Sequence, residues 1–188
     1  MQIIGTFGRG IGINPDDVKM EDATKAVVTA DVYIYGGTPL TLTTVAGVSY
    51  LVSYPYLHDA SITMNQAAYG VSKFNKNANI DETFDTLGTY GSGKGTCINL
   101  GRVSLMNNVF RTSTGGLTTV FGFDTSITNY VAMQPLYVNL DHTSAYFGML
   151  TNVLVSGETA DKNTNTLVGY VSAYFAHATQ PVLEIVLA

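Results

Sequence analysis

The stretch GTYGSGKGT, residues 88–96, has the residue types and spacing of a phosphate-binding loop. Such a loop works because closely spaced glycines expose main-chain amides, while a lysine places a positive charge beside the phosphate. The chemistry would be nucleotide binding or phosphoryl transfer, with Lys94 in contact with the phosphates. The segments on either side of the stretch decide between this interpretation and an ordinary turn.

The match does not extend beyond the nine residues of the motif. They resemble the adenylate kinase form of the loop, Gly-x-Pro-Gly-x-Gly-Lys-Gly-Thr, but Tyr90 replaces the proline, and Gly95 breaks the general Gly-x4-Gly-Lys-[Ser/Thr] pattern. A phosphate loop follows a hydrophobic strand and opens a helix at its lysine. Here the acidic segment 79–87 comes before the motif, and a segment with strand character, 97–108, comes after it. We therefore interpret the motif as a glycine-rich turn.

A second glycine motif, GTFGRGIG at residues 5–12, is similar to a dinucleotide-binding fingerprint at its first two glycines. The third glycine of that fingerprint would fall at Ile13, and Pro15 stands where a helix should follow. An extended glycine-rich arm over residues 1–14 explains the composition better. The sequence therefore predicts no bound nucleotide cofactor.

Histidines beside aspartates are the remaining candidates for catalysis or metal binding. His58 is followed by Asp59, and His142 is preceded by Asp141, so a triad with a serine or a His–Asp metal site is conceivable. Adjacent residues on a strand point to opposite faces, however, and no Gly-x-Ser-x-Gly turn is present. We interpret both histidines, and His177, as loop or interface residues.

The other reactive side chains have structural explanations. The acidic pairs at 16–17 and 81–82 suit the first turns of helices. Cys97 is the single cysteine, which excludes an intramolecular disulfide, and we expect it to be a small buried hydrophobic residue. The sequence thus predicts no catalytic, cofactor-binding or metal-binding residue, and the expected protein is not an enzyme.

The composition points to a polar surface with little charge. Only 12% of the 188 residues are charged, against about 25% in a typical soluble protein, and the net charge is −5. The absence of a basic cluster argues against a nucleic-acid partner. The sequence also offers no signal peptide and no apolar run of transmembrane length, so no membrane partner is expected. Neutral hydroxyl-bearing surfaces cost less to desolvate than charged ones, which favours protein contacts.

Alternating apolar and polar residues predict a chain made mostly of strands. The predicted strands cover residues 26–35, 40–45, 47–54, 117–123, 130–140, 145–155, 166–175 and 181–187, and Pro135 should lie at an edge or bulge. One or two helical turns at most are predicted within 14–25, and short helices are predicted over 65–74 with Asn65 as its cap and over 80–87. The expected fold is mainly β: an antiparallel β-sandwich or jelly-roll-like barrel with one or two short helices. Residues 1–14 would form an extended arm and residues 15–188 a single β domain.

The twelve tyrosines include several that should face outward on strands, where tyrosine and threonine make a contact surface for protein or sugar. In overall composition the chain resembles virion proteins of tailed bacteriophages, most of all head decoration or cement proteins. This resemblance implies a structural protein on the capsid exterior of the virion, made in the host cytoplasm. It also implies a homo-oligomer, a trimer or dimer, that bridges subunits of the major capsid protein and stabilises the shell.

Within that resemblance, the arm from Met1 to Asn14 is the expected contact with the capsid lattice. Two alternatives stay open at this point. One is a tail tube or fibre-base protein or a carbohydrate-binding β module. Binding of glycans would be revealed by a sugar array. The other is a P-loop nucleotide-binding enzyme, which requires that Lys94 contact phosphate.

Overall fold

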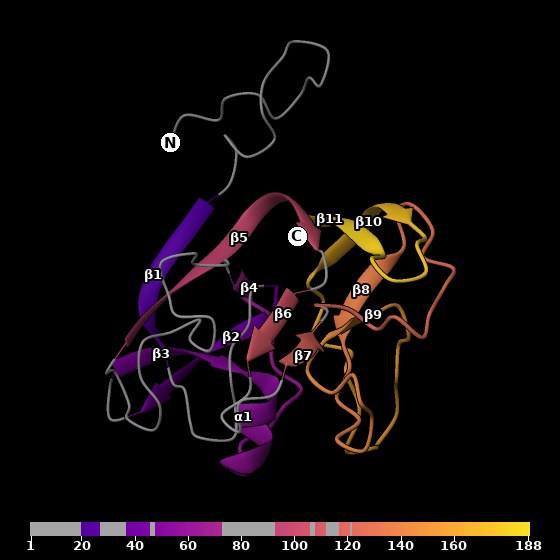
Figure 1. Ribbon diagram of the computed structural model, residues 1–188. Helices are drawn as coiled ribbons and strands as arrows, with labels where there is room; N and C mark the ends of the chain where they lie inside the picture. The colour runs from indigo at the N-terminus through magenta and orange to yellow at the C-terminus, as the bar shows by residue number, and fades with distance from the viewer. Residues whose placement is uncertain are drawn as a thin grey trace.

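The protein is mainly β, as predicted. The computed structural model describes residues 20–26, 37–45, 48–72, 93–105, 108–111, 117–120 and 122–188 (Figure 1). Within these residues the chain forms eleven strands and one short helix. Nine of the strands belong to one sheet, in the order β1-β3-β2-β4-β5-β11-β10-β8-β9. The predicted arm, 1–14, and most of the predicted strand 26–35 lie outside the described residues, so the arm and its boundary with the β domain stay predictions.

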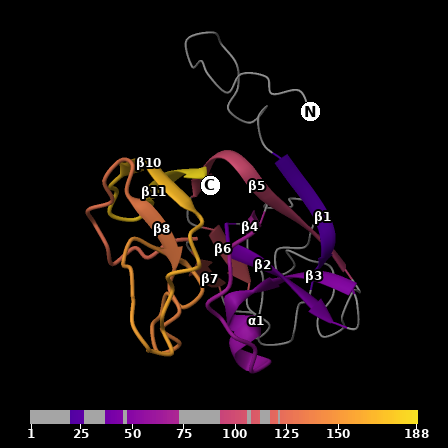
Figure 2. The same cartoon turned by 180° about the vertical axis from the view of Figure 1, so that it is seen from behind.

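The first five strands of this sheet close on themselves. They are β1 (Met20–Ala26), β2 (Pro39–Val45), β3 (Val48–Ser53), β4 (Gly70–Ser72) and β5 (Gly93–Leu105). β1 pairs antiparallel with β5 and also meets β3 through one parallel pair, so the pairings run in a circuit. Figures 1 and 2 show the strands curling around one side of the molecule.

The second half of β5 carries the rest of the sheet. Its residues 101–105 pair with β11 (Val182–Leu187), which pairs with β10 (Gly169–Phe175). β8 (Pro135–Val138) and the two-residue β9 (Leu150–Thr151) complete the order, and all these pairs are antiparallel. A separate hairpin joins β6 (Asn108–Arg111) to β7 (Leu117–Val120).

This arrangement is one long curled sheet plus a hairpin. The strand pairings do not establish two facing sheets, so the predicted sandwich or jelly-roll topology stays a prediction. Pro135 is the first residue of β8, where its missing amide leaves no gap inside the ladder.

Alternation of side chains between two faces explains the core of the second half. On its inner face, the strands present Leu136 and Val138 from β8, Val171 from β10, and Leu183, Ile185 and Leu187 from β11, all buried. Residues directly opposite each other on antiparallel strands share a face, and the observed register matches these positions. A bulge between Val171 and Ala173 inserts one residue, so that Tyr174 lies opposite Leu183 and packs against the same core.

The helix is found in a different place from those predicted. α1 (Tyr54–Asp59) follows β3 directly, and the Ser53 hydroxyl caps it by accepting a hydrogen bond from the Tyr56 amide at 3.3 Å. Pro55 ends the strand, as expected, but its fixed φ also suits the first turn of a helix. The predicted end of the strand depends only on the first of these two properties.

The helix predicted over 65–74 is wrong where the structure describes it. Residues 62–69 are irregular, and 70–72 form β4 between β2 and β5. A Cβ on Gly70 would collide with the Ile98 carbonyl, so glycine permits this close strand pairing. The Asn65 side chain does not cap a helix. It instead accepts a hydrogen bond from the amide of Asn165, a residue far away in the sequence, at 3.0 Å.

The second half of 14–25 is strand, since β1 begins at Met20 and pairs with β5 along its length, so the one or two helical turns predicted within this range do not form there. Residues 14–19 and the helix predicted over 80–87 lie outside the described residues. Two predicted strands are shorter than expected: 130–140 contains only β8, and 145–155 contains only β9.

Local hydrogen bonds shorten these strands. The Asn139 side chain accepts from the Asp141 amide, and the Ser144 hydroxyl accepts from the Tyr146 amide, which holds residues 139–149 in successive turns. Gly148 has a φ of +79°, a left-handed conformation that interrupts a strand.

Candidate functional site

The phosphate-loop motif ends in a strand. Gly93 begins β5, and Lys94 pairs with Lys25 of β1 in the ladder. The strand predicted after the motif is confirmed, and it starts inside the motif itself. Because β5 continues to Leu105, no helix N-terminus follows Lys94 to direct main-chain amides at a phosphate. Residues 88–92 lie outside the described part, as do the motif at 5–12 and the acidic pairs at 16–17 and 81–82.

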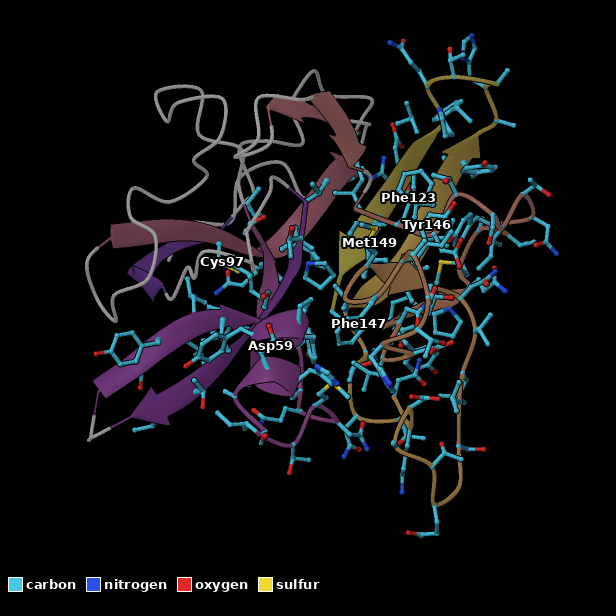
Figure 3. The ribbon with its side chains drawn as sticks, turned by 60° about the horizontal axis from the view of Figure 1, so that its bottom comes forward. Asp59, Cys97, Phe123, Tyr146, Phe147 and Met149 are labelled. Carbon is cyan, nitrogen blue, oxygen red and sulfur yellow. The ribbon has the colours of Figure 1, made fainter. Side chains whose placement is uncertain are left out.

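Cys97 is a buried hydrophobic residue, as predicted. Its side chain is fully buried on β5 and packs with Leu40 and Leu51, and its thiol donates a weak hydrogen bond to the Ile98 carbonyl at 3.8 Å (Figure 3). Burial in apolar surroundings disfavours the thiolate, which is the nucleophilic form.

The histidines separate into two groups. His177 is exposed in the turn between β10 and β11, where its Nδ1 accepts a hydrogen bond from the Gln180 amide at 3.1 Å. His58, in α1, and His142, in the turn after β8, meet with their rings stacked at 5.0 Å between centroids and 19° between planes. Phe147 contacts the His58 ring edge-on at 5.5 Å, so α1 and residues 139–149 share an aromatic contact (Figure 3).

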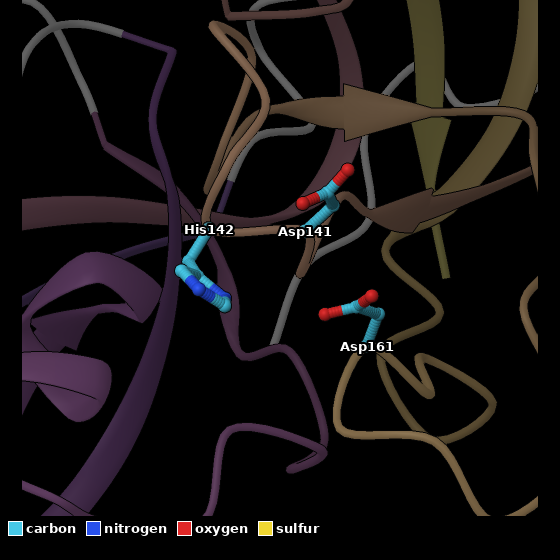
Figure 4. A group of neighbouring side chains, drawn as sticks. All are labelled: Asp141, His142 and Asp161. Atoms are coloured by element: carbon cyan, nitrogen blue, oxygen red, sulfur yellow. The ribbon is translucent and has the colours of Figure 1, made fainter.

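Asp141 and His142 lie beside Asp161, a residue that the sequence analysis did not single out. One potential ligand atom from each of the three side chains lies within 4.8 Å of the others, and Figure 4 shows the three around a common space. Hydrogen bonds from the Thr143 hydroxyl and amide to the Asp141 carboxylate, at 2.6 and 2.9 Å, lower the pKa of Asp141 below its usual range. This carboxylate is therefore negatively charged at neutral pH and can act as a metal ligand.

Asn163 explains how Asp161 reaches the other two residues. Its side chain is 1% exposed, donates hydrogen bonds to the carbonyls of Val138 and Val153, and accepts one from the Val155 amide. These bonds hold the loop that follows β9 against the end of β8. Asp141 and Asp161 are twenty residues apart, and no spacing rule in the sequence connects them.

A cavity of about 230 Å³ adjoins the cluster. Its lining is rich in acidic and amide side chains: Asp124, Asn139, Asp141, Asp161 and Asn163. Asp124 is buried, and its carboxylate accepts hydrogen bonds from the Ser126 amide and hydroxyl at 2.9 and 2.6 Å. Leu140, Thr151, Val153 and Val155 complete the lining, so the cavity combines three carboxyl groups with apolar side chains.

A second candidate site is the outer face of the second half of the sheet. One position on each of four neighbouring strands forms a row: Pro135 of β8, Tyr170 of β10, Val186 of β11 and Arg102 of β5. Tyr170 and Val186 are 37% and 39% exposed, and Phe175 farther along β10 is 55% exposed. We call this the outer sheet face, and its residues Pro135, Arg102, Tyr170, Phe175 and Val186 define it.

The tyrosines divide as predicted between core and surface. Tyr54 and Tyr130 are buried, and their hydroxyls donate to the carbonyls of Gln66 and Asp124 at 3.0 and 2.8 Å. Burial raises the pKa of both phenols well above the usual value. Tyr170 instead presents its ring on the outer sheet face.

Comparisons with protein-family models, with curated proteins and with solved structures gave no match. The described part of the chain contains no helix of the length and apolar character needed to cross a membrane.

Proposed function

We propose that this protein is a structural subunit of a bacteriophage virion that binds the outside of the capsid and stabilises the shell by bridging capsid subunits. The observation that carries the proposal is the outer sheet face, where exposed tyrosine, valine and phenylalanine side chains lie on neighbouring strands. The resemblance in composition to head decoration proteins supplies the identity of the partner.

The physical basis of the contact is desolvation at low cost. The outer sheet face combines apolar and aromatic side chains with the charged side chains of Arg102 and Glu184, and aromatic residues and arginine are common in protein interfaces. With 12% charged residues in the chain, few ions need to lose water on docking. Each bound copy would stabilise the assembled shell by mass action, and a homo-oligomer would contact several capsid subunits at once.

Co-sedimentation with empty capsids tests this proposal. The protein should pellet with capsids at a fixed stoichiometry and raise the temperature at which the shells disassemble. Tyr170→Lys together with Val186→Lys should abolish pelleting, because two charges would then have to be buried at the contact. A stable monomer with no affinity for capsids would show that the proposal is wrong.

A matched control separates loss of the contact from loss of apolar surface in general. Leu154 is 51% exposed but lies in the loop after β9, away from the outer sheet face, so Leu154→Lys should leave capsid binding unchanged. Deletion of residues 2–14 tests the predicted arm separately, and weaker pelleting of that variant would support a lattice contact through the arm.

A carbohydrate-binding module remains the second candidate because of one hollow in the surface. This hollow, about 570 Å³, lies beside the turn between β10 and β11 and is lined by Thr125, Thr128, Tyr174, His177 and Thr179 among others. Hydroxyls with an aromatic ring are groups that bind sugars. Signal on a sugar array that disappears in Thr128→Val would favour this candidate over capsid binding.

A further inference from the structure

We propose that Asp141, His142 and Asp161 bind a divalent transition-metal ion, of which Zn²⁺ is the best probe. The proposal does not depend on the structural role argued above. It starts from the convergence of one imidazole and two carboxylates from two different loops, with a potential ligand atom of each within 4.8 Å of the others (Figure 4).

The donor set selects the class of ion. Imidazole nitrogen suits zinc, copper, iron and nickel, whereas sites for Mg²⁺ and Ca²⁺ are built from oxygen ligands alone. One nitrogen and two carboxylate oxygens with no thiolate match the His and Asp ligation that Zn²⁺ accepts, with water completing four-coordination. Zinc at about 2.1 Å from each ligand needs ligands about 3.4 Å apart, so the side chains must close slightly around the ion. His142 is exposed and the two aspartates are half-buried, which leaves room for that movement.

The surroundings hold two of the ligands in place before any ion arrives. Stacking on His58 orients the His142 ring, and the His58 ring is itself in a T-shaped contact with Phe147. The Asp141 carboxylate is oriented by two hydrogen bonds from Thr143. Imidazole and carboxylate are thus positioned by neighbours that are not themselves ligands, as second-shell partners position ligands in metal sites.

The local excess of negative charge also favours the binding of a cation. Residues 122–188 contain five acidic side chains, Asp124, Asp141, Glu158, Asp161 and Glu184, and one basic side chain, Lys162. Neither Asp141 nor Asp161 forms an ion pair with another residue that the structure describes, yet both line the same cavity with the buried Asp124. Two carboxylates that face each other repel, and a divalent ion between them would turn that repulsion into attraction.

Isothermal titration calorimetry, in which ZnCl₂ is added to the chelator-treated full-length protein, tests the site. We expect one saturable site per chain and a rise in the unfolding temperature with Zn²⁺. Co²⁺ in place of Zn²⁺ should give visible absorption bands that report nitrogen and oxygen ligation. Mg²⁺ and Ca²⁺ should bind more weakly than Zn²⁺.

Two substitutions remove ligands while keeping shape. Asp161→Asn removes a charge, and His142→Phe keeps a ring stacked on His58 but removes its nitrogens. Loss of an outer-shell partner alone weakens metal sites by about 10–100-fold, so each change should reduce Zn²⁺ affinity at least about 10-fold. The matched controls are Glu158→Gln, in the same loop as Asp161, and His177→Phe, an exposed histidine elsewhere, and both should bind Zn²⁺ as the unchanged protein does.

Three outcomes would overturn the proposal: no saturable Zn²⁺ binding, affinity that survives both ligand substitutions, or equal affinity for Ca²⁺ and Zn²⁺. Circular dichroism of each variant distinguishes a lost ligand from a misfolded chain.

Discussion

At the scale of single residues, Asn163 joins two segments in the second half of the molecule through its side chain. Its amide group bonds three main-chain groups from two segments, and it is almost completely buried. Removing it leaves buried donors and acceptors without partners, which costs more than the hydrogen bonds themselves contribute.

We therefore expect Asn163→Ala to lower the free energy of unfolding by about 3 kcal/mol, at about 1–3 kcal/mol for each unsatisfied group. Urea denaturation measures this value. Asn129→Ala, at an exposed asparagine, is the control and should change stability by less than about 0.5 kcal/mol. Equal effects of the two substitutions would contradict the role assigned to Asn163.

The buried phenols Tyr54 and Tyr130 make stability depend on alkaline pH. Their pKa values are raised in the folded protein, so the folded state keeps protons that the unfolded state releases above pH of about 10. The contribution of these two phenols to the free energy of unfolding is fully present below that pH and is lost as the pH rises further. Urea denaturation at pH 8 and pH 10.5 should show this fall. The fall should be smaller in Tyr54→Phe and unchanged in Tyr170→Phe, where the phenol is exposed.

At the scale of elements, the short helix α1 depends on its cap and on a glycine packed against it. Ser53 caps the helix, and Gly148 approaches Pro55 so closely that an added Cβ would lie 2.6 Å from the proline Cδ. A six-residue helix is too short to be stable alone, so these contacts decide whether it forms.

Replacing the cap tests the first contact. Ser53→Ala should lower the free energy of unfolding by about 1 kcal/mol, the usual value of an N-cap hydroxyl. Ser49→Ala, at an exposed position of the same strand β3, should have little effect. Thermal or urea unfolding of the pair measures the difference, and no difference would show that the Ser53 hydroxyl contributes nothing.

A pair of glycines tests the second contact. Gly148 and Gly157 both have positive φ, +79° and +97°, but an added Cβ meets Pro55 at Gly148 and no atom within 4 Å at Gly157. Both alanine substitutions should cost about 1–2 kcal/mol for backbone strain. Gly148→Ala should cost more, and the excess measured by urea denaturation reports the packing against α1. Identical losses would mean that the helix can shift without cost.

The elements also show which structural features could be predicted from the sequence. The strand at 181–187 was predictable because its alternating side chains match one buried face, and 166–175 begins with the same alternation. The strands at 40–45 and 47–54 were predictable from their branched and aromatic residues, although consecutive residues 50–53 are buried on both faces. The strands around 130–155 were overextended, because the bonds of Asn139 and Ser144 to the main chain outweigh strand propensity. The burial of Cys97 followed from residue type, whereas Asp161 joins Asp141 and His142 only through tertiary contacts.

At the scale of the whole molecule, β5 belongs to both parts of the sheet. Its first half pairs with β1 and β4, and its second half pairs with β11, so neither part of the sheet is complete without this strand. We expect a single cooperative unfolding transition, in which near-ultraviolet and far-ultraviolet circular dichroism change together. Separate transitions would indicate that the parts are independent domains.

The inserted residue in β10 determines which aromatic side chains contact each other. Tyr174 meets Phe123 and Tyr130, with ring centroids 6.4 and 5.3 Å away, because the bulge restores its inward direction. If Ser172 were instead paired in a regular ladder, Tyr174 and Phe175 would exchange places, so that a phenol would lose its two ring neighbours and a phenyl group would turn inward. The register of this one strand, as much as its composition, determines which of its side chains face the core and which face water.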